Sequence, residues 1–455
     1  MTTIISNGAD QVQDQRENPV PDAGPATPVH RGLLRFATAG SVDDGKSTLV
    51  GRLLYDSKSV LSDQLEAAER TSTARGSATV DLSLLVDGLR AEREQGITID
   101  VAYRYFATPA RTFILADTPG HVQYTRNTVT GASTADVVVV LVDARTGVIA
   151  QTRNHATVAA LLGVPHLVLA VNKIDLVDYD QEVFDRIAGE FADYATGLGI
   201  KDVVAVPISA LNGDNVVTRS EAMPWYDGPS VLEFLETVDI THDRDDQSMR
   251  FPVQYVIRPG SDYAADPDYR GYAGRISAGT VRRGDPIVVL PQGIPTSVVG
   301  IDTADGPREV AYAGESVTLL LADNIDIARG DLLAAAADAP RTLTEFQATV
   351  TQLGDKPLRK GARLLLRYGT STSRVIVGSL DHLLHIDTLQ VAESPEQLAL
   401  NDIGLITLRL VEPLPVEPYR NGGRVGSLLL VDPADGTTVA AGMVGDRQQD
   451  LHPRS

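Results

Sequence analysis

The sequence contains no cysteine and no long apolar run. Without cysteine, the chain can form no disulfide framework and can perform no thiolate chemistry, which fits a cytoplasmic protein. No apolar stretch approaches the roughly 18 residues that a membrane-spanning helix needs, so we expect no membrane partner. The first residues lack a basic segment followed by an apolar one, so we also expect no signal peptide.

Basic residues are scarce relative to acidic ones. The 455 residues include 40 Lys and Arg against 60 Asp and Glu, which gives a formal net charge of −20. Because phosphate contacts require clustered Lys and Arg, this balance disfavours nucleic acid as a main partner, although it does not exclude a local basic patch. The chain is too long for one ordinary domain, and 43% hydrophobic residues suffice for real cores. We expect two to four domains.

Residues 40–48 form the stretch around which the sequence is organised. They fit the pattern G-x-x-x-x-G-K-S of a phosphate-binding loop, between a strand predicted at 33–37 and a helix predicted to begin at Lys46. Glycines let the backbone turn so that N–H groups and the positive end of the helix face the phosphates. Lys46 can reach the outer phosphates, and the Ser47 hydroxyl can bind Mg²⁺. The predicted nucleotide-binding residues of this loop are Gly40, Ser41, Val42, Asp43, Asp44, Gly45, Lys46, Ser47 and Thr48.

Two later segments are predicted to sense the γ-phosphate. A long polar insertion at 56–96 leads into the segment that contains Thr98. This region is either a solvated charged helix and turn or a switch loop in which the Thr98 hydroxyl joins the Mg²⁺ shell only when a γ-phosphate is present. A strand expected at 113–116 leads into Asp117, Thr118, Pro119, Gly120 and His121. The Asp117 carboxylate would hold Mg²⁺ through water, the Gly120 N–H would bond the γ-phosphate, and His121 would orient the attacking water. The alternative is a Pro-Gly turn followed by a surface histidine. The predicted catalytic residues are Lys46, Thr98, Gly120 and His121, and the predicted Mg²⁺ ligands are Ser47, Thr98 and Asp117.

The base is predicted to bind at two further strand ends. The run at 167–171 leads into Asn172, Lys173, Ile174 and Asp175, and a strand at 204–208 leads into Ser209, Ala210 and Leu211. The Asp175 carboxylate can accept hydrogen bonds from both N1–H and the 2-amino group of guanine. Adenine lacks this pair of donors, and sites built on such hydrogen bonds can discriminate between the two bases by roughly 10⁴ or more. The aliphatic stem of Lys173 can cover the base, and backbone N–H groups of residues 209–211 can close over it. The order of these motifs predicts a GTPase that uses Mg²⁺.

The pattern of apolar runs predicts the fold class. Short apolar runs alternate with amphipathic stretches from residue 33, and runs at 137–142 and 167–171 suit strands buried on both faces of a parallel sheet. Ser230 and Glu233 fit a capping box that opens a helix closing this part near Ile240. After this point short alternating strands predominate.

These later strands, for example at 286–290, 316–321, 373–380 and 403–410, indicate two small barrels. We therefore predict an α/β P-loop GTPase domain, with a mostly parallel sheet and helices on both faces, followed by two small all-β barrels. The predicted divisions are a flexible tail at 1–31, the GTPase domain at 32–240, barrels at 241–340 and 341–446, and a C-terminal tail at 447–455.

Several motifs carry a family resemblance that spans about 33–446. They lie at 40–54, 84–106, 117–127, 223–229, 250–256, 270–274 and 441–444. The arrangement resembles the translation-factor GTPases and, within them, the large GTPase subunits of heterodimeric bacterial sulfate adenylyltransferase, or ATP sulfurylase. Elongation factors usually have G-H-V-D-H-G or G-H-V-D-S-G in the phosphate loop, where this chain has Ser41 and Asp44.

The resemblance implies that GTP hydrolysis on this chain drives adenylyl transfer by a smaller, ATP-pyrophosphatase-like subunit. That partner would join ATP and sulfate into adenylyl sulfate and pyrophosphate, the first step of sulfate assimilation, in a heterodimer or a higher assembly. The alternative is an elongation-factor-like GTPase that delivers an RNA to the ribosome. The acidic balance, Ser41, Asp44 and the turn around Trp225 favour the first interpretation.

Overall fold

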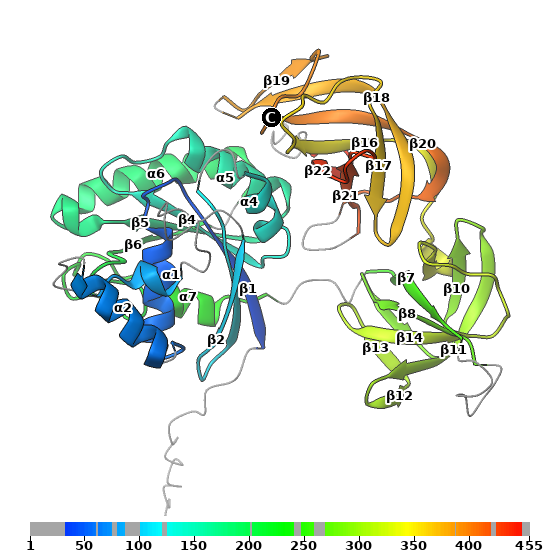
Figure 1. Ribbon diagram of the computed structural model, residues 1–455, viewed down its shortest axis with the longest axis horizontal. Coiled ribbons are helices and arrows are strands. Elements are labelled where there is room, and N and C mark those ends of the chain that lie inside the picture. The colour runs from blue at the N-terminus through cyan, green and yellow to red at the C-terminus, as the bar shows by residue number, and fades with distance from the viewer. Residues whose placement is uncertain are drawn as a thin grey trace, which may run out of the picture.

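The computed structural model describes residues 32–60, 62–74, 80–86, 101–120, 125–200, 203–240, 247–258, 269–386, 388–419 and 425–447. Over these ranges the chain forms an α/β unit followed by two β units (Figure 1). None of the helices within these ranges has both the length and the hydropathy of a membrane-spanning helix. The fold class predicted from the sequence is confirmed.

The α/β unit contains one six-stranded sheet, made of β1 (Leu33–Ala39), β2 (Ala102–Ala107), β3 (Thr112–Asp117), β4 (Val137–Asp143), β5 (His166–Asn172) and β6 (Val203–Pro207). The strand order is β2-β3-β1-β4-β5-β6, and all pairs are parallel except β2 with β3. Strand β4 is buried along its whole length, as the apolar run at 137–142 predicts. The carboxyl ends of β1, β3, β4, β5 and β6 therefore meet at one edge.

Helices cover both faces of this sheet (Figure 1). They are α1 (Lys46–Asp56), α2 (Ser62–Ala74), α4 (Thr125–Ala132), α5 (Ala150–Leu161), α6 (Gln181–Gly197) and α7 (Val231–Thr237), with short 3₁₀ turns η1 (Leu82–Leu85) and η3 (Ile174–Val177). The predicted capping box opens α7, because the Ser230 N–H donates to the Glu233 carboxylate and the Glu233 N–H donates to the Ser230 hydroxyl, at 2.8 and 3.2 Å. The helix ends at Thr237, slightly before the predicted limit.

The second unit is built from antiparallel strands around a core that includes Phe251, Tyr272 and Leu319. The strands are β7 (Arg250–Ile257), β8 (Gly271–Arg275), β9 (Thr280–Arg282), β10 (Pro286–Leu290), β11 (Ile294–Thr303), β12 (Gly306–Arg308), β13 (Val310–Tyr312), β14 (Ser316–Leu321) and β15 (Leu332–Ala335), followed by the 3₁₀ turn η4 (Ala336–Asp338). Pairing of β10 with β11 joins six of them in the cycle β10-β15-β7-β8-β14-β11. The predicted strands at 286–290 and 316–321 coincide with β10 and β14.

The third unit is a closed six-stranded barrel with the cycle β17-β21-β22-β16-β20-β18. Its strands, with β19 added beside β18, are β16 (Thr342–Gln352), β17 (Arg363–Tyr368), β18 (Ser371–His385), β19 (Gln390–Glu393), β20 (Ile403–Pro415), β21 (Ser427–Val431) and β22 (Thr438–Val444). Strand β18 is much longer than the predicted 373–380, because β-bulges at Val377/Ser379 and Leu380/His382 shift its alternation.

The third unit contacts both of the others. Leu384, Ile403 and Met443 belong to the same buried cluster as the core of the α/β unit. The Tyr194 hydroxyl donates to the carbonyl oxygen of Ile386 at 3.0 Å across this contact. Because apolar burial is continuous across the boundary, the α/β unit and the barrel pack directly rather than through solvent.

Candidate nucleotide site

The phosphate loop joins β1 to α1 in a conformation that requires glycine. Gly40 and Gly45 have φ angles of 155° and 90°, which L-residues with side chains rarely adopt. A Cβ atom at Gly45 would lie 2.3 Å from the side-chain nitrogen of Asn172. Asp43, between them, also has a positive φ of 68°. The loop therefore turns tightly onto the start of α1, where the backbone N–H groups of the first turn are free to meet phosphate.

The ammonium group of Lys46 lies inside this loop. It donates to the carbonyl oxygens of Gly40 and Ser41 at 2.9 and 2.7 Å. Burial lowers the pKa of Lys46, and the nearby carboxylates of Asp117 and Asp44 oppose that shift. Burial likewise raises the pKa of Asp44, whose carboxylate accepts from the Ser41 N–H. A cation is thus centred where polyphosphate charge would need neutralisation.

The end of β3 lies beside this loop. The Asp117 side chain is fully buried and accepts from the Thr38 hydroxyl of β1 at 3.0 Å. The Thr118 hydroxyl donates to the Thr38 carbonyl oxygen at 2.6 Å, which fixes the exit of the strand. At Gly120 a Cβ atom would lie 2.7 Å from the backbone carbonyl oxygen of Gly40 and 2.8 Å from the carbonyl carbon of Ser41. Only glycine therefore allows this segment to pack against the phosphate loop.

The Asn172 side chain connects the phosphate loop to the predicted base-binding loops. Its amide nitrogen donates to the Asp44 carbonyl oxygen at 2.7 Å, and its amide oxygen accepts from the Ala210 N–H at 2.9 Å. Lys173 follows with a φ of 61°, and its amine nitrogen lies 3.0 Å from the Asp143 carboxylate. Asp175 is half-buried in the first turn of η3. The predicted guanine-recognition motif is thus attached to the phosphate loop by direct hydrogen bonds.

Most of the predicted site residues lie together at the carboxyl edge of the sheet. The phosphate loop, 117–120, 172–175 and 209–211 follow β1, β3, β5 and β6 respectively. Ser209 is buried, whereas the Leu211 side chain is 58% exposed. Ser47 is the second residue of α1 and is half-buried. Thr98 and His121 lie outside the described residues, so their predicted roles stay predictions.

Three residues of this region were missed by the motif analysis. Asp143 ends β4, and although burial works against it, hydrogen bonds from Arg145 and Lys173 lower the pKa of its carboxyl group. Its position directly after the run at 137–142 was the available signal, because strand ends form this site. Arg52 of α1 donates to the carbonyl oxygens of Ala210 and Leu211, and no local pattern announces that contact.

The third missed residue is His155 of α5. Its ring is buried and forms a hydrogen bond with the backbone of Gly40, while a ring nitrogen lies 3.2 Å from the Gln151 amide nitrogen. Burial and the charge of Lys46 lower the pKa of His155 to about 3. The histidine is therefore neutral at ordinary pH and stabilises the phosphate loop through its hydrogen bond to the Gly40 backbone.

Known proteins resemble this chain along most of its length. A family model of the elongation factor Tu GTP binding domain matches residues 31–242, and one of the GTP-eEF1A C-terminal domain-like family matches residues 345–445. The "Bifunctional enzyme CysN/CysC" of Mycobacterium tuberculosis is 54% identical over 413 residues, which cover 90% of this chain and 67% of that protein. The "Sulfate adenylyltransferase subunit 1" of Bacteroides fragilis is 47% identical over 419 residues, which cover 92% and 87% respectively.

A solved structure shares the fold. The Ski7 GTPase-like domain of S. cerevisiae, bound to GDP and inorganic phosphate, has a TM-score of 0.51 at 18% identity, covering 91% of this chain and 98% of that one. The likeness to the Bacteroides fragilis protein, in contrast, is one of sequence and extends far beyond the nucleotide-binding part. The chain therefore belongs to the sulfate adenylyltransferase subunit 1 family, within the GTPases of the elongation factor Tu type.

Proposed function

We propose that this chain is the GTP-hydrolysing subunit of a heterodimeric sulfate adenylyltransferase. Its small, ATP-pyrophosphatase-like partner would join ATP and sulfate into adenylyl sulfate and pyrophosphate, driven by GTP cleavage. The observation that carries this proposal is the 47% identity to a protein named sulfate adenylyltransferase subunit 1 over 92% of the chain. A nucleotide domain borrowed by an unrelated protein would match only in its first half.

The chemistry explains why coupling is needed. Sulfate is a poor nucleophile, and adenylyl sulfate is a high-energy mixed anhydride, so its formation from ATP and sulfate is unfavourable without another source of free energy. Hydrolysis of GTP can supply it only if the two events are linked through protein contacts. A division into a hydrolysing chain and an adenylylating chain meets this requirement.

The geometry supports a guanine nucleotide held by the predicted residues. Loop N–H groups and Lys46 would hold the phosphates, Asp175 would accept from the guanine edge, and the Lys173 stem would cover the base. The Asn172 amide would keep these two halves of the site at a fixed separation, since it bonds to both loops.

Mg²⁺ fits the oxygen donors present at the phosphate end. We propose Ser47, Thr98 and Asp117 as the residues that hold it, because hydroxyl and carboxylate oxygens are the ligands Mg²⁺ prefers. The buried Asp117 carboxylate, oriented by the Thr38 hydroxyl, supports this assignment. When bound, the ion would neutralise developing charge on the outer phosphates. Gly120 would donate its N–H to the γ-phosphate, and His121 would orient the attacking water.

A pyrophosphate-release assay on the chain with its small subunit tests the proposed function. With ATP and sulfate present, addition of GTP is expected to raise the rate of pyrophosphate release. The Lys46→Ala variant should lose GTP hydrolysis and the GTP-dependent part of that rate together, because both depend on the same bound nucleotide. Loss of hydrolysis with the stimulation intact would argue against coupling.

A further inference from the structure

The third unit carries a positive surface on an acidic protein. Six basic and no acidic residues occur between positions 356 and 374, although the chain has a net charge of −20. In the β17–β18 hairpin, Arg363, Arg367 and Arg374 are all exposed. Arg374 lies opposite Leu365, so it is diagonal to both other arginines. These three arginines define one outward surface, the basic face.

The charges of the basic face have no carboxylate partner within the described ranges. Some other exposed arginines of the two barrels do have one, since Arg409 pairs with Glu345 and Arg308 pairs with Glu315. Like charges at neighbouring cross-strand positions repel, which destabilises the free chain. An acidic surface placed over the hairpin would relieve this repulsion and would be attracted to it over a long range.

Exposed aliphatic side chains lie among the arginines. Ile376 is 37% exposed and lies opposite Arg363, and Leu429 of β21 is 40% exposed and lies opposite Arg367. Aliphatic groups mixed with arginine are typical of the centre of a protein–protein contact. A nucleic-acid backbone, which is bound mainly by positive charge, would leave these aliphatic groups unused. The composition therefore favours an acidic protein as the occupant.

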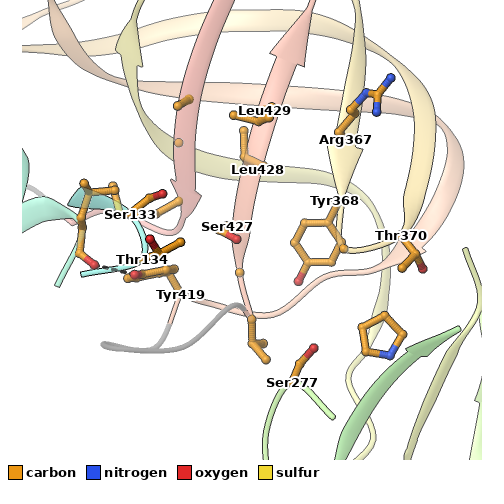
Figure 2. A pocket seen from close by; sticks show the side chains of 18 of the residues that line it. Ser133, Thr134, Ser277, Arg367, Tyr368, Thr370, Tyr419, Ser427, Leu428 and Leu429 are labelled. Atoms are coloured by element: carbon orange, nitrogen blue, oxygen red, sulfur yellow. Dashed lines mark hydrogen bonds between the residues drawn. The ribbon is translucent and has the colours of Figure 1, made fainter. Parts of the chain in front are cut away.

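The basic face borders a cavity of about 640 Å³ where the three units meet (Figure 2). Arg367 and Leu429 line the cavity from the third unit, while Thr130 of α4 and Ser133 line it from the α/β unit. The Thr370 hydroxyl oxygen, also in its wall, is buried and has no hydrogen-bond partner among the described residues. A buried hydroxyl of this kind stabilises a complex in which an incoming polar group bonds to it.

We propose that the small subunit docks an acidic surface on the basic face and inserts an adjoining segment into this cavity. The inference rests on the proposed function, because it takes the partner from there. The inserted segment would contact α4, which begins just after the segment that ends in Gly120. Gly120 packs against the phosphate loop, so a change at the γ-phosphate would reach the partner through this helix.

The test measures binding of the small subunit to the full chain by titration calorimetry. Replacing Arg363, Arg367 and Arg374 together with Glu should raise the dissociation constant on the order of 100-fold, because three attractive contacts become repulsive. Binding of the unaltered chain should weaken with added salt, and that dependence should largely disappear in the variant. GTP affinity should not change. Arg329→Glu, a reversal at an exposed arginine of the second unit, is the matched control and should bind normally.

Three outcomes would overturn the inference, and a fourth would refute the function on which it rests. Unchanged binding by the triple Glu variant would refute the basic face alone, whereas failure of the unaltered chain to bind the small subunit at all would refute the proposed function. A triple Lys variant keeps the charge, so a loss as large as that of the Glu variant would show that charge is not what the partner recognises. If the Glu variant instead loses binding to a transfer-RNA mixture and keeps the subunit, the face binds nucleic acid.

Discussion

The nucleotide site and the junction of the two barrels are held together in different ways. At the nucleotide site, short segments at the ends of neighbouring strands are linked through backbone groups, as the two bonds of Asn172 illustrate. At the barrel junction, Arg250 of the second unit forms a buried bidentate ion pair with Glu417 of the third, at 2.6 and 2.7 Å. The contact between the α/β unit and the third barrel instead combines continuous apolar packing with hydrogen bonds from tyrosine hydroxyls to carbonyl oxygens.

This difference indicates where the molecule can move. Separating Arg250 from Glu417 would break two charge-assisted hydrogen bonds between largely buried side chains, which costs several kcal/mol. Breaking a hydroxyl-to-carbonyl bond costs only about 1 kcal/mol. The two barrels are thus expected to stay together, and a response to the nucleotide is expected at the contact with the α/β unit. Substitutions in the two regions should have separable effects.

The largest effect is expected for Asp175→Asn. The introduced amide would donate a hydrogen bond where the Asp175 carboxylate would accept one. The guanine edge would therefore lose its acceptor, whereas xanthine would gain a donor for its 2-oxo group. We expect the preference for GTP over xanthosine triphosphate to fall by roughly 10⁴ or more, with barrel stability unchanged. Competition binding with the two nucleotides measures this directly. Retained GTP selectivity would refute the assignment of the base site.

Glu417→Ala should produce the complementary result. Arg250, which is only 3% exposed, would lose its bidentate partner and keep the Asp338 carboxylate at 3.3 Å, so the barrels should lose about 3 kcal/mol of stability. Urea unfolding followed by circular dichroism measures this loss. Trp225 is the only tryptophan and packs on Phe184 in the α/β unit, so its fluorescence transition is an internal control that should not shift. Equal shifts in both signals would contradict the proposed separation of the two regions.

The buried histidine predicts a pH dependence confined to the α/β unit. The pKa of His155 is about 3 in the folded chain and about 6.5 when unfolded, so below pH 6.5 the unfolded chain binds a proton that the folded chain does not. The free energy of unfolding should therefore decrease as the pH is lowered from 6.5 toward 3, by about 2 kcal/mol between pH 6.5 and pH 5. His155→Gln should remove that part of the slope in urea titrations followed by Trp225 fluorescence. Identical slopes for the unaltered chain and the variant would contradict a buried, neutral His155 ring in the folded chain.

The smallest effect is expected for Tyr419→Phe. The Tyr419 hydroxyl donates to the Leu162 carbonyl oxygen, and the ring also lies 5.7 Å from the Arg447 guanidinium, a contact that phenylalanine would keep. We expect a loss of about 0.5–1.5 kcal/mol at the contact between the α/β unit and the third barrel. Hydrogen exchange of the amides in α5 and β22 would detect such a loosening. A loss as large as that of Glu417→Ala would remove the distinction between the two contacts.

The sequence was most informative where chemistry is local. Each motif of the site is a run of consecutive residues that follows an apolar strand: the phosphate loop, the 117–120 segment and the 172–175 motif. Both the presence of these motifs and their position at strand ends were therefore predictable. Arg250 and Glu417 are separated by 167 residues, and no local pattern connects them. The length of β18 was also missed, because its bulges interrupt the period-two alternation on which strand prediction depends. The predicted domain limits stay predictions.

The most direct measurement follows phosphate from GTP and adenylyl sulfate in one reaction that contains the chain, its small subunit, ATP and sulfate. If GTP cleavage drives sulfate activation, adenylyl sulfate should accumulate well above the level reached without GTP, in proportion to the phosphate released. The same adenylyl sulfate level with and without GTP, while phosphate is still released, would contradict the central claim.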